Sequence, residues 1–193
     1  MIDTSALSQP VQELLKLNAQ NAYKKLVVTD GFAPAREILK SLSAASIFCK
    51  PVARSDEAQA ALAGLWLWHD CLDESHTISQ GIHTATGSYW HAILHRREGD
   101  FSNSKYWYAK AASHPVRKAM APKAAEIVRS SKVAQHVSAV LLGGFDPDAL
   151  VDLAEEASHV KDDPKLETLI ALQRAEWETL FELNVNAATK RTT

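Results

Sequence analysis

Signals that start and stop helices recur along the whole chain of 193 residues, and they restrict its fold more than any other feature. Pro147 and Pro164 each follow an aspartate, an order typical of a capping residue and the first turn of a helix. Pro51 and Pro115 interrupt the chain, because proline cannot continue a helix and restricts the residue before it. Clusters of β-branched residues are few and do not alternate over a long span. The sequence therefore predicts an all-α protein, a single-domain bundle of about six to eight helices.

The size and charge of the chain limit its organisation and its partners. An apolar content of 46% is enough for one well-buried core, so residues 1–193 are predicted to form one domain, with residues 186–193 as a frayed tail. The net charge of -2 argues against bulk attraction to nucleic acid or to an anionic membrane. No signal-peptide pattern or membrane-spanning run is present, and the two cysteines fit a reducing compartment. These features predict a soluble, cytoplasmic protein that binds neither nucleic acid nor membrane.

One predicted helix, residues 55–80, carries a stripe that changes from apolar to polar. The stripe, taken at helical spacing, consists of Leu62, Leu65, Trp66, His69, Asp73, His76 and Gln80. Its first half must face the core, so its second half is expected to point inward or into a cleft as well. A buried carboxylate or imidazole costs several kcal/mol unless it is paired, hydrogen-bonded or bound to a metal. The stripe therefore predicts polar partners for this part of the helix on a neighbouring element.

The next predicted helix, residues 88–98, supplies such partners. His91 and His95 stand four residues apart on one face, and Glu98 follows one turn later. The connection between the two helices is short, which predicts an antiparallel hairpin. In such a hairpin the two histidines face the polar half of the preceding helix.

This hairpin predicts a metal site. The candidate ligands are Asp73, His76, His91 and His95. Two helices that each give side chains three or four residues apart can build a metal site inside a bundle, and three nitrogens with one oxygen suit zinc, iron, manganese or nickel. With one coordination position open, the metal could generate hydroxide from bound water, and Glu98 is the candidate general base. A metal-free network of hydrogen bonds among the same residues is the alternative.

Basic and polar side chains around the turn at Gly99 predict an anion-binding group. The candidate substrate-binding residues are Arg96, Arg97, Asn103 and Tyr106. A pair of guanidinium groups beside the free N–H groups at the start of a predicted helix over residues 102–112 could hold a carboxylate or a phosphate. The alternative is structural, because either arginine could instead pair with a nearby carboxylate (Glu98, Asp100 or Asp73) and fix the turn.

The same part of the chain resembles a known group of sequences. The segments LDESHTISQ (72–80) and TGSYWHAILHRREGDFSNSKYW (86–107) are similar to a family of uncharacterised proteins from soil bacteria and fungi. The resemblance implies that the family's characteristic positions are Asp73, His76, His91, His95, Arg96, Arg97, Glu98, Asp100, Asn103, Tyr106 and Trp107. The family has no established activity, so the resemblance locates a site without naming its reaction.

Together these features predict a metal-dependent hydrolase that acts on a small polar or anionic molecule, with a divalent metal as its cofactor. The alternative is a non-enzymatic ligand-binding or interaction protein whose His, Asp and Arg residues form a structural hydrogen-bond network. The apolar last helix, which starts near Pro164, could also serve as the contact surface of a homodimer.

Overall fold

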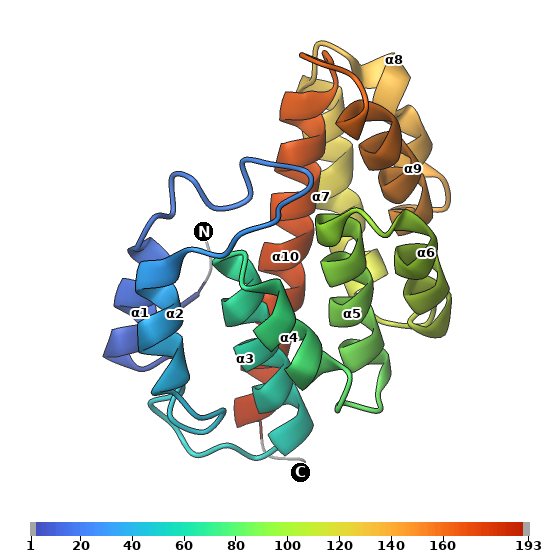
Figure 1. Ribbon diagram of the computed structural model, residues 1–193. Coiled ribbons are helices and arrows are strands. Elements are labelled where there is room, and N and C mark those ends of the chain that lie inside the picture. The colour runs from blue at the N-terminus through green and yellow to red at the C-terminus, as the bar shows by residue number, and fades with distance from the viewer. Residues whose placement is uncertain (1–2, 191–193) are drawn as a thin grey trace.

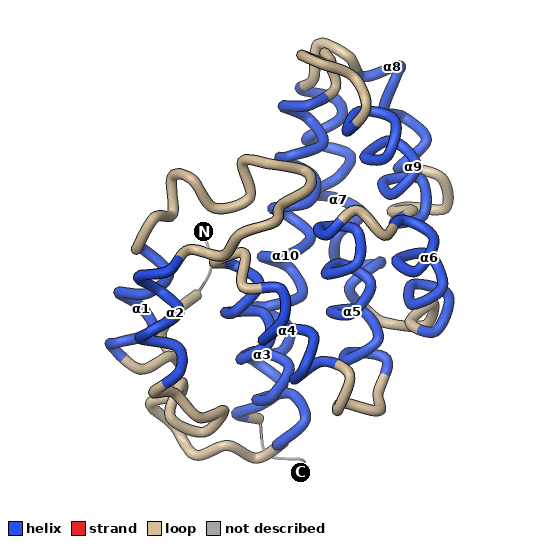
Figure 2. The backbone as a smooth tube through the Cα atoms, in the orientation of Figure 1, coloured by secondary structure: helices blue, strands red, loops and turns tan. Residues whose placement is uncertain are grey.

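The computed structural model describes residues 3–190, and over this range the chain is all-helical (Figure 1, Figure 2). The helices are α1 (Gln9–Lys16), α2 (Ala33–Lys40), α3 (Ser55–Trp68), α4 (Leu72–Ser79), α5 (Ala85–Glu98), α6 (Phe101–Lys110), α7 (Val116–Ser130), α8 (Ala134–Val137), the 3-10 helix η1 (Ser138–Leu141), α9 (Pro147–Ser158) and α10 (Leu166–Thr189). The predicted all-α class is confirmed. The described residues form ten α-helices rather than six to eight, because the region 55–80 contains two helices and α8 is a single turn.

The longest helix, α10, forms the centre of the core (Figure 1). Helices α3, α7 and α9 all pack against it. Its side chains Leu172, Trp177, Leu180 and Phe181 have no exposed surface. Burying a large apolar side chain contributes about 1.5–3 kcal/mol, so this helix supplies a large part of the stability. The apolar residues that suggested a homodimer surface are therefore already used inside one chain.

The prediction of one continuous helix over 55–80 is wrong, because the chain breaks between α3 and α4. Asp70, at the break, has a left-handed φ of 60°, which a right-handed helix cannot contain. The amide of Phe32, the residue before α2, donates a hydrogen bond to the carbonyl of His69 at 2.8 Å, so a distant segment fixes the backbone at the break. Helix α4 folds back on α3 and also packs against α5. Since α4 is a separate helix, the face defined by the apolar half of the stripe does not continue into it.

Helix α5 begins one turn earlier than the sequence predicts. The Thr84 hydroxyl accepts a hydrogen bond from the amide of Gly87, so Thr84 caps the helix. A Cβ atom at Gly87 would lie 2.1 Å from the carbonyl oxygen of Ile82, so only glycine fits this close approach. The helix ends as expected at Gly99, where φ is 89°.

Helix α6 follows at once and lies against α5 and α9. Asp100 caps it by accepting a hydrogen bond from the amide of Asn103 at 3.2 Å, so the helix begins at Phe101, one residue before the predicted start. The buried Ser104 hydroxyl donates to the carbonyl of Ala92 at 2.8 Å and ties the two helices together. This contact brings the inner face of α6 beside the histidines of α5.

The sequence from Pro10 to Leu26 has the apolar spacing of one helix, but in the structure the helix is short and a long loop follows it. Helix α1 ends at Lys16, and residues 17–32 cross over the ends of α3 and α4 before α2 begins (Figure 2). Asn18 and Tyr23 in this loop both have a left-handed φ of 58°, which stops helical continuation. The amphipathic spacing of the segment was therefore a weaker signal than its local turns.

The end of α10 is more ordered than a frayed tail. The helix continues to Thr189, and the buried Ala188 carbonyl accepts a hydrogen bond from the amide of Ala53 at 2.7 Å. The rest of the predicted tail, residues 191–193, lies outside the described residues. Within residues 3–190, no helix has both the length and the apolar character that crossing a membrane requires.

Candidate functional site

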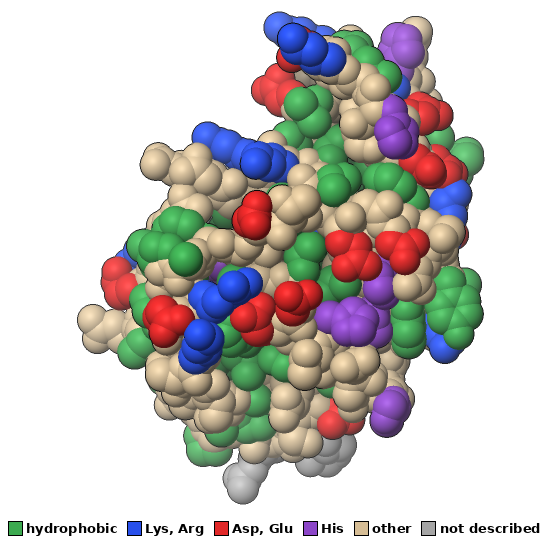
Figure 3. Space-filling view, viewed as in Figure 1, with side chains coloured by type: hydrophobic (Ala, Val, Ile, Leu, Met, Phe, Trp, Pro, Cys, Tyr) green, Lys and Arg blue, Asp and Glu red, His purple; other side chains and the backbone are tan. Residues whose placement is uncertain are grey.

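Helices α4 and α5 bring three of the four predicted ligands together. His76, His91 and His95 each offer a ring nitrogen, and these atoms all lie within 4.8 Å of one another. The ring centroids are 4.5 Å apart for His76 and His91, 5.6 Å for His76 and His95, and 4.8 Å for His91 and His95. His91 and His95 are buried and His76 is half-buried, so the group opens to one face. Figure 3 shows histidines gathered on the face over α4 and α5, next to acidic side chains. We call these three residues the histidine triad.

His91 is the member of the triad that most needs a partner. Its Nδ1 is buried and has no hydrogen-bond partner among the described residues. Burial lowers the pKa of His91 to about 4, and the neighbouring His95 and His76 act in the same direction. The ring is therefore neutral near neutral pH and keeps a lone pair for a metal ion. Trp107 of α6 stacks on it with centroids 4.1 Å apart and planes 9° apart, which fixes the orientation of the ring.

His95, by contrast, has two protein partners. Its Nδ1 lies 2.5 Å from Oε1 of Glu98. The Asn103 amide nitrogen lies 3.1 Å from its Nε2 and 3.4 Å from its Nδ1, so it sits beside the ring rather than along the Nε2 lone pair. A proton on Nδ1, donated to Glu98, leaves the Nε2 lone pair for a metal ion. A carboxylate behind a histidine is also the usual way to orient a metal ligand and raise its basicity.

The structure does not place Asp73 with the triad. Asp73 is exposed on α4, and it is not one of the residues whose ligand atoms come together. The break at Asp70 is the physical reason, since the stripe drawn through both helices does not describe α4 alone. Carboxylates near the triad come from the end of α5 instead, where Glu98 and Asp100 lie within 4.8 Å of His95. Of these, the sequence singled out Glu98 as a base and placed Asp100 only at the turn.

Arg96 does not form the predicted anion clamp. It is fully buried and donates to Oε2 of Glu176 at 2.6 Å and to the Tyr108 hydroxyl at 2.7 Å. The Tyr89 hydroxyl donates to the other oxygen of Glu176 at 2.7 Å, so this carboxylate is enclosed by donors. Burial alone would lower the pKa of Arg96, but Glu176 outweighs it and the pKa is raised. This arginine is a fixed structural charge.

Arg97 is equally unavailable to an anionic substrate bound at the triad. It is fully buried, donates to the Asp70 carboxylate and to the Lys25 carbonyl, and lies 4.2 Å from the centre of the Tyr23 ring. The structural alternative therefore describes both arginines better than the clamp does. Its partners were nevertheless wrong, because Asp70 and Glu176 are distant in sequence and not the neighbours expected.

Asn103 and Tyr106, the other predicted substrate residues, differ in their position. Asn103 touches the triad through His95, whereas Tyr106 is 54% exposed and packs against Trp107 and Lys110. Sequence reasoning gave no site role to Lys110 and named Trp107 only among the positions that the resemblance implies, although Trp107 stands four residues after Asn103 on the same helical face. That spacing was the signal that could have found it.

A pocket of about 360 Å³ is lined by Trp107, the residue that stacks on His91, but by none of the triad itself. It is lined by the connection between α4 and α5, by Trp107 and by Lys110. The Lys110 ammonium lies 4.5 Å from the centre of the Trp107 ring, so it supplies the one positive charge of this pocket lining. His83, also in the lining, is exposed and lies outside the triad.

Fold and site together define an all-helical protein with a partly buried histidine triad between two antiparallel helices. Comparisons of the chain with protein-family models, with curated proteins and with solved structures found no match. The resemblance of residues 72–107 to a family of uncharacterised proteins stays a prediction, and the site is interpreted from its own geometry.

Proposed function

We propose that the protein binds one divalent transition-metal ion through His76, His91 and His95. The observation that carries this proposal is the approach of three imidazole nitrogens to within 4.8 Å, one of them on a buried ring whose Nδ1 has no partner among the described residues. Zinc, iron, manganese and nickel all accept such a donor set. Three protein ligands leave a coordination position for water or a small molecule, as in catalytic rather than structural metal sites.

The chemistry that fits such a centre is hydrolysis of a small polar molecule. A bound metal would lower the pKa of its water, and the half-buried position of His76 leaves one side of the triad open to a substrate. Glu98 is hydrogen-bonded to His95, so we assign it to orienting that ligand rather than to acting as a free general base. With both arginines buried in ion pairs, the cation nearest to an incoming anion is Lys110.

The second candidate function is non-enzymatic, and one observation favours it. His95 already has two protein partners, Glu98 on its Nδ1 and the Asn103 amide beside its ring. A network of this kind holds helices in register without any chemistry. In this alternative the triad belongs to the network through His95, and His91 is a neutral histidine held by stacking on Trp107.

Metal titration of the purified full chain distinguishes the two functions. Zinc binding is measured by calorimetry and cobalt binding by visible absorption, in the wild type, in His91→Ala and in a matched control, His83→Ala. We expect one metal ion per chain, a loss of affinity of at least about tenfold in His91→Ala, and no change in the control, because His83 is exposed and outside the triad. Affinity should fall steeply below about pH 6, as the ligands compete with protons.

Two outcomes contradict the metal proposal. One is the absence of stoichiometric metal in the wild type after reconstitution with each of the four metals. The other is equal affinity in the wild type and in His91→Ala. Either result leaves the hydrogen-bond network as the better account of the triad.

A further inference from the structure

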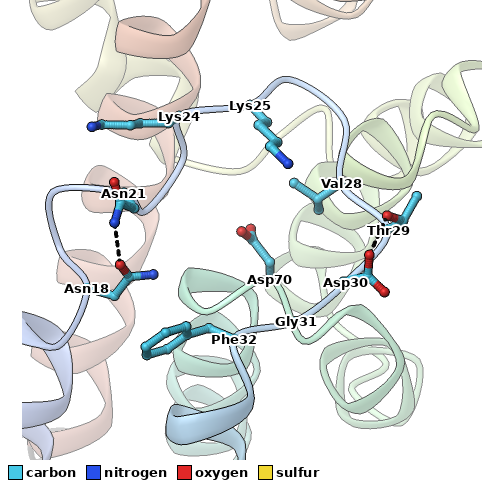
Figure 4. A pocket seen from close by; sticks show the side chains of 10 residues that line it. All are labelled: Asn18, Asn21, Lys24, Lys25, Val28, Thr29, Asp30, Gly31, Phe32 and Asp70. Atoms are coloured by element: carbon cyan, nitrogen blue, oxygen red, sulfur yellow. Dashed lines mark hydrogen bonds between the residues drawn. The ribbon is translucent and has the colours of Figure 1, made fainter.

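A second polar pocket lies away from the triad, where the long loop over residues 17–32 meets the turn between α3 and α4 (Figure 4). Its volume is about 400 Å³, within the range of small-molecule sites. The loop reaches the turn at Gly31, where a Cβ atom would lie 2.8 Å from Sγ of Cys71 and 3.2 Å from the carbonyl of Asp70. Only glycine allows this approach, so the wall of the pocket is fixed by close packing.

The floor of the pocket is the Asp70 carboxylate. Figure 4 shows it pointing up into the space enclosed by the loop, and 23% of the side chain is exposed. The buried Arg97 is the one side chain among the described residues that hydrogen-bonds to it, and the same guanidinium also donates to the Lys25 carbonyl. Asp70 is also held in a left-handed conformation with φ of 60°. The carboxylate is thus anchored on one side and open on the other.

A lysine faces this carboxylate from the opposite wall. In Figure 4 the Lys25 ammonium points down toward Asp70, yet it forms no ion pair with any carboxylate of residues 3–190. The Lys25 backbone is fixed, because its carbonyl accepts hydrogen bonds from Arg97 and, at 2.8 Å, from Gln173. The neighbouring Lys24 extends away from Asp70 (Figure 4). Asp30, the second carboxylate of the lining, accepts a hydrogen bond from the Thr29 hydroxyl at 2.9 Å. Asp70 and Lys25 are therefore the two opposite charges of the lining that face each other without forming an ion pair.

We infer that this pocket binds a small zwitterion of the size of an amino acid, with its ammonium group on Asp70 and its carboxylate on Lys25. A simple anion would meet the Asp70 carboxylate, and a simple cation would meet Lys25, whereas a molecule with both charges satisfies both walls. Phe32 adds an apolar surface for the rest of the ligand. Burial raises the pKa of Asp70 and Arg97 opposes this effect, so an added ammonium group would further stabilise the ionised carboxylate.

The test is calorimetric titration of the full chain with each of the twenty common L-amino acids, with acetate and ethylammonium as singly charged probes. We expect at least one amino acid to bind and both singly charged probes to bind at least about tenfold more weakly. Lys25→Gln should weaken binding by at least about tenfold, while Lys24→Gln, with the same change of charge one residue away, should change it by less than about twofold. The Lys25 substitution keeps the backbone carbonyl that Arg97 and Gln173 need, so the fold is retained.

Three results would overturn the inference. They are no binding of any of the twenty amino acids at about 10 mM, equal loss of binding in Lys24→Gln and Lys25→Gln, and equal binding of acetate or ethylammonium. His91→Ala should leave amino-acid binding unchanged, because this pocket shares no lining residue with the triad. Failure here and failure of the metal site are therefore separate outcomes.

Discussion

Two groups of basic side chains stand next to each other on α5, and their surroundings are opposite. Arg96 and Arg97 have no exposed surface, and each meets a carboxylate brought from a distant part of the chain. His91 is also buried, but its nearest titratable neighbours are two more imidazoles, and its Nδ1 has no described partner. The charge of each arginine is balanced by a carboxylate, although its Nε has no described partner, and such a buried ion pair holds the fold. A neutral imidazole with an unpartnered ring nitrogen is instead suited to a ligand.

The largest effect should come from breaking the arginine side of this comparison. Glu176→Ala would leave the buried Arg96 without its carboxylate, and removing one partner of a buried ion pair costs about 3–5 kcal/mol. The control is Glu178→Ala on the same helix, which breaks only a partly exposed pair with Arg174 and should cost less than about 1 kcal/mol. Chemical denaturation measures both. Similar losses of unfolding free energy in the two variants would mean that the buried Arg96–Glu176 pair stabilises the fold no more than a partly exposed pair does.

A smaller but more specific effect tests the histidine side. If the triad binds metal, zinc at one hundred times its dissociation constant should stabilise the wild type by about 2.7 kcal/mol. His91→Ala should lose this metal-dependent increment whatever its own stability without metal. Denaturation curves with and without zinc give the increment directly. An increment of the same size in His91→Ala would show that zinc binds elsewhere.

Acid should destabilise the fold through two buried histidines outside the triad. Burial lowers the pKa of His69 and of His114 from 6.5 to about 4. Between these two pH values the unfolded chain binds protons that the folded chain does not, so stability falls as pH falls through this window and is fully present above it. Each histidine contributes at most about 1.4 kcal/mol per pH unit.

Denaturation measured at pH 7, 6, 5 and 4.5 gives the slope of the free energy of unfolding against pH. His114→Gln should reduce it, whereas His136→Gln, which removes an exposed histidine, should leave it unchanged. Equal slopes in His114→Gln and in the wild type would show that protonation of His114 does not oppose folding.

The smallest effect separates the two accounts of His95. Asn103→Ala removes one hydrogen bond at a half-buried position and should cost about 0.5–1.5 kcal/mol. If the triad binds metal, this variant should bind zinc at least as tightly as the wild type, because the Asn103 amide lies against the His95 ring and is not one of the three ligands. Calorimetric titration measures the affinity. Weaker zinc binding in Asn103→Ala would mean that this amide supports the metal site rather than opposing it.

The candidate site was predictable where it depended on spacing within one helix. His91 and His95 lie on one face of α5, and the short connection to α4 does bring His76 against them. Asp73 was predicted from a stripe that ran through a break, and the stripe carried no signal for the left-handed residue at Asp70. Arg96 and Arg97 were assigned partners among near neighbours, because sequence shows only near neighbours.

The sequence by itself determined the helical class, the ends of α5 and α6 to within about a turn, and the location of a polar group around α4 and α5. These features depend on local chemistry: caps, prolines, glycines and the 3.6-residue period. Only the tertiary structure decided that α10 fills the core, that Glu176 and Asp70 neutralise the two arginines, and that His91 keeps a free ring nitrogen. The reason is physical, since the pairing of a buried charge depends on which distant segment packs beside it, and no local pattern records that choice.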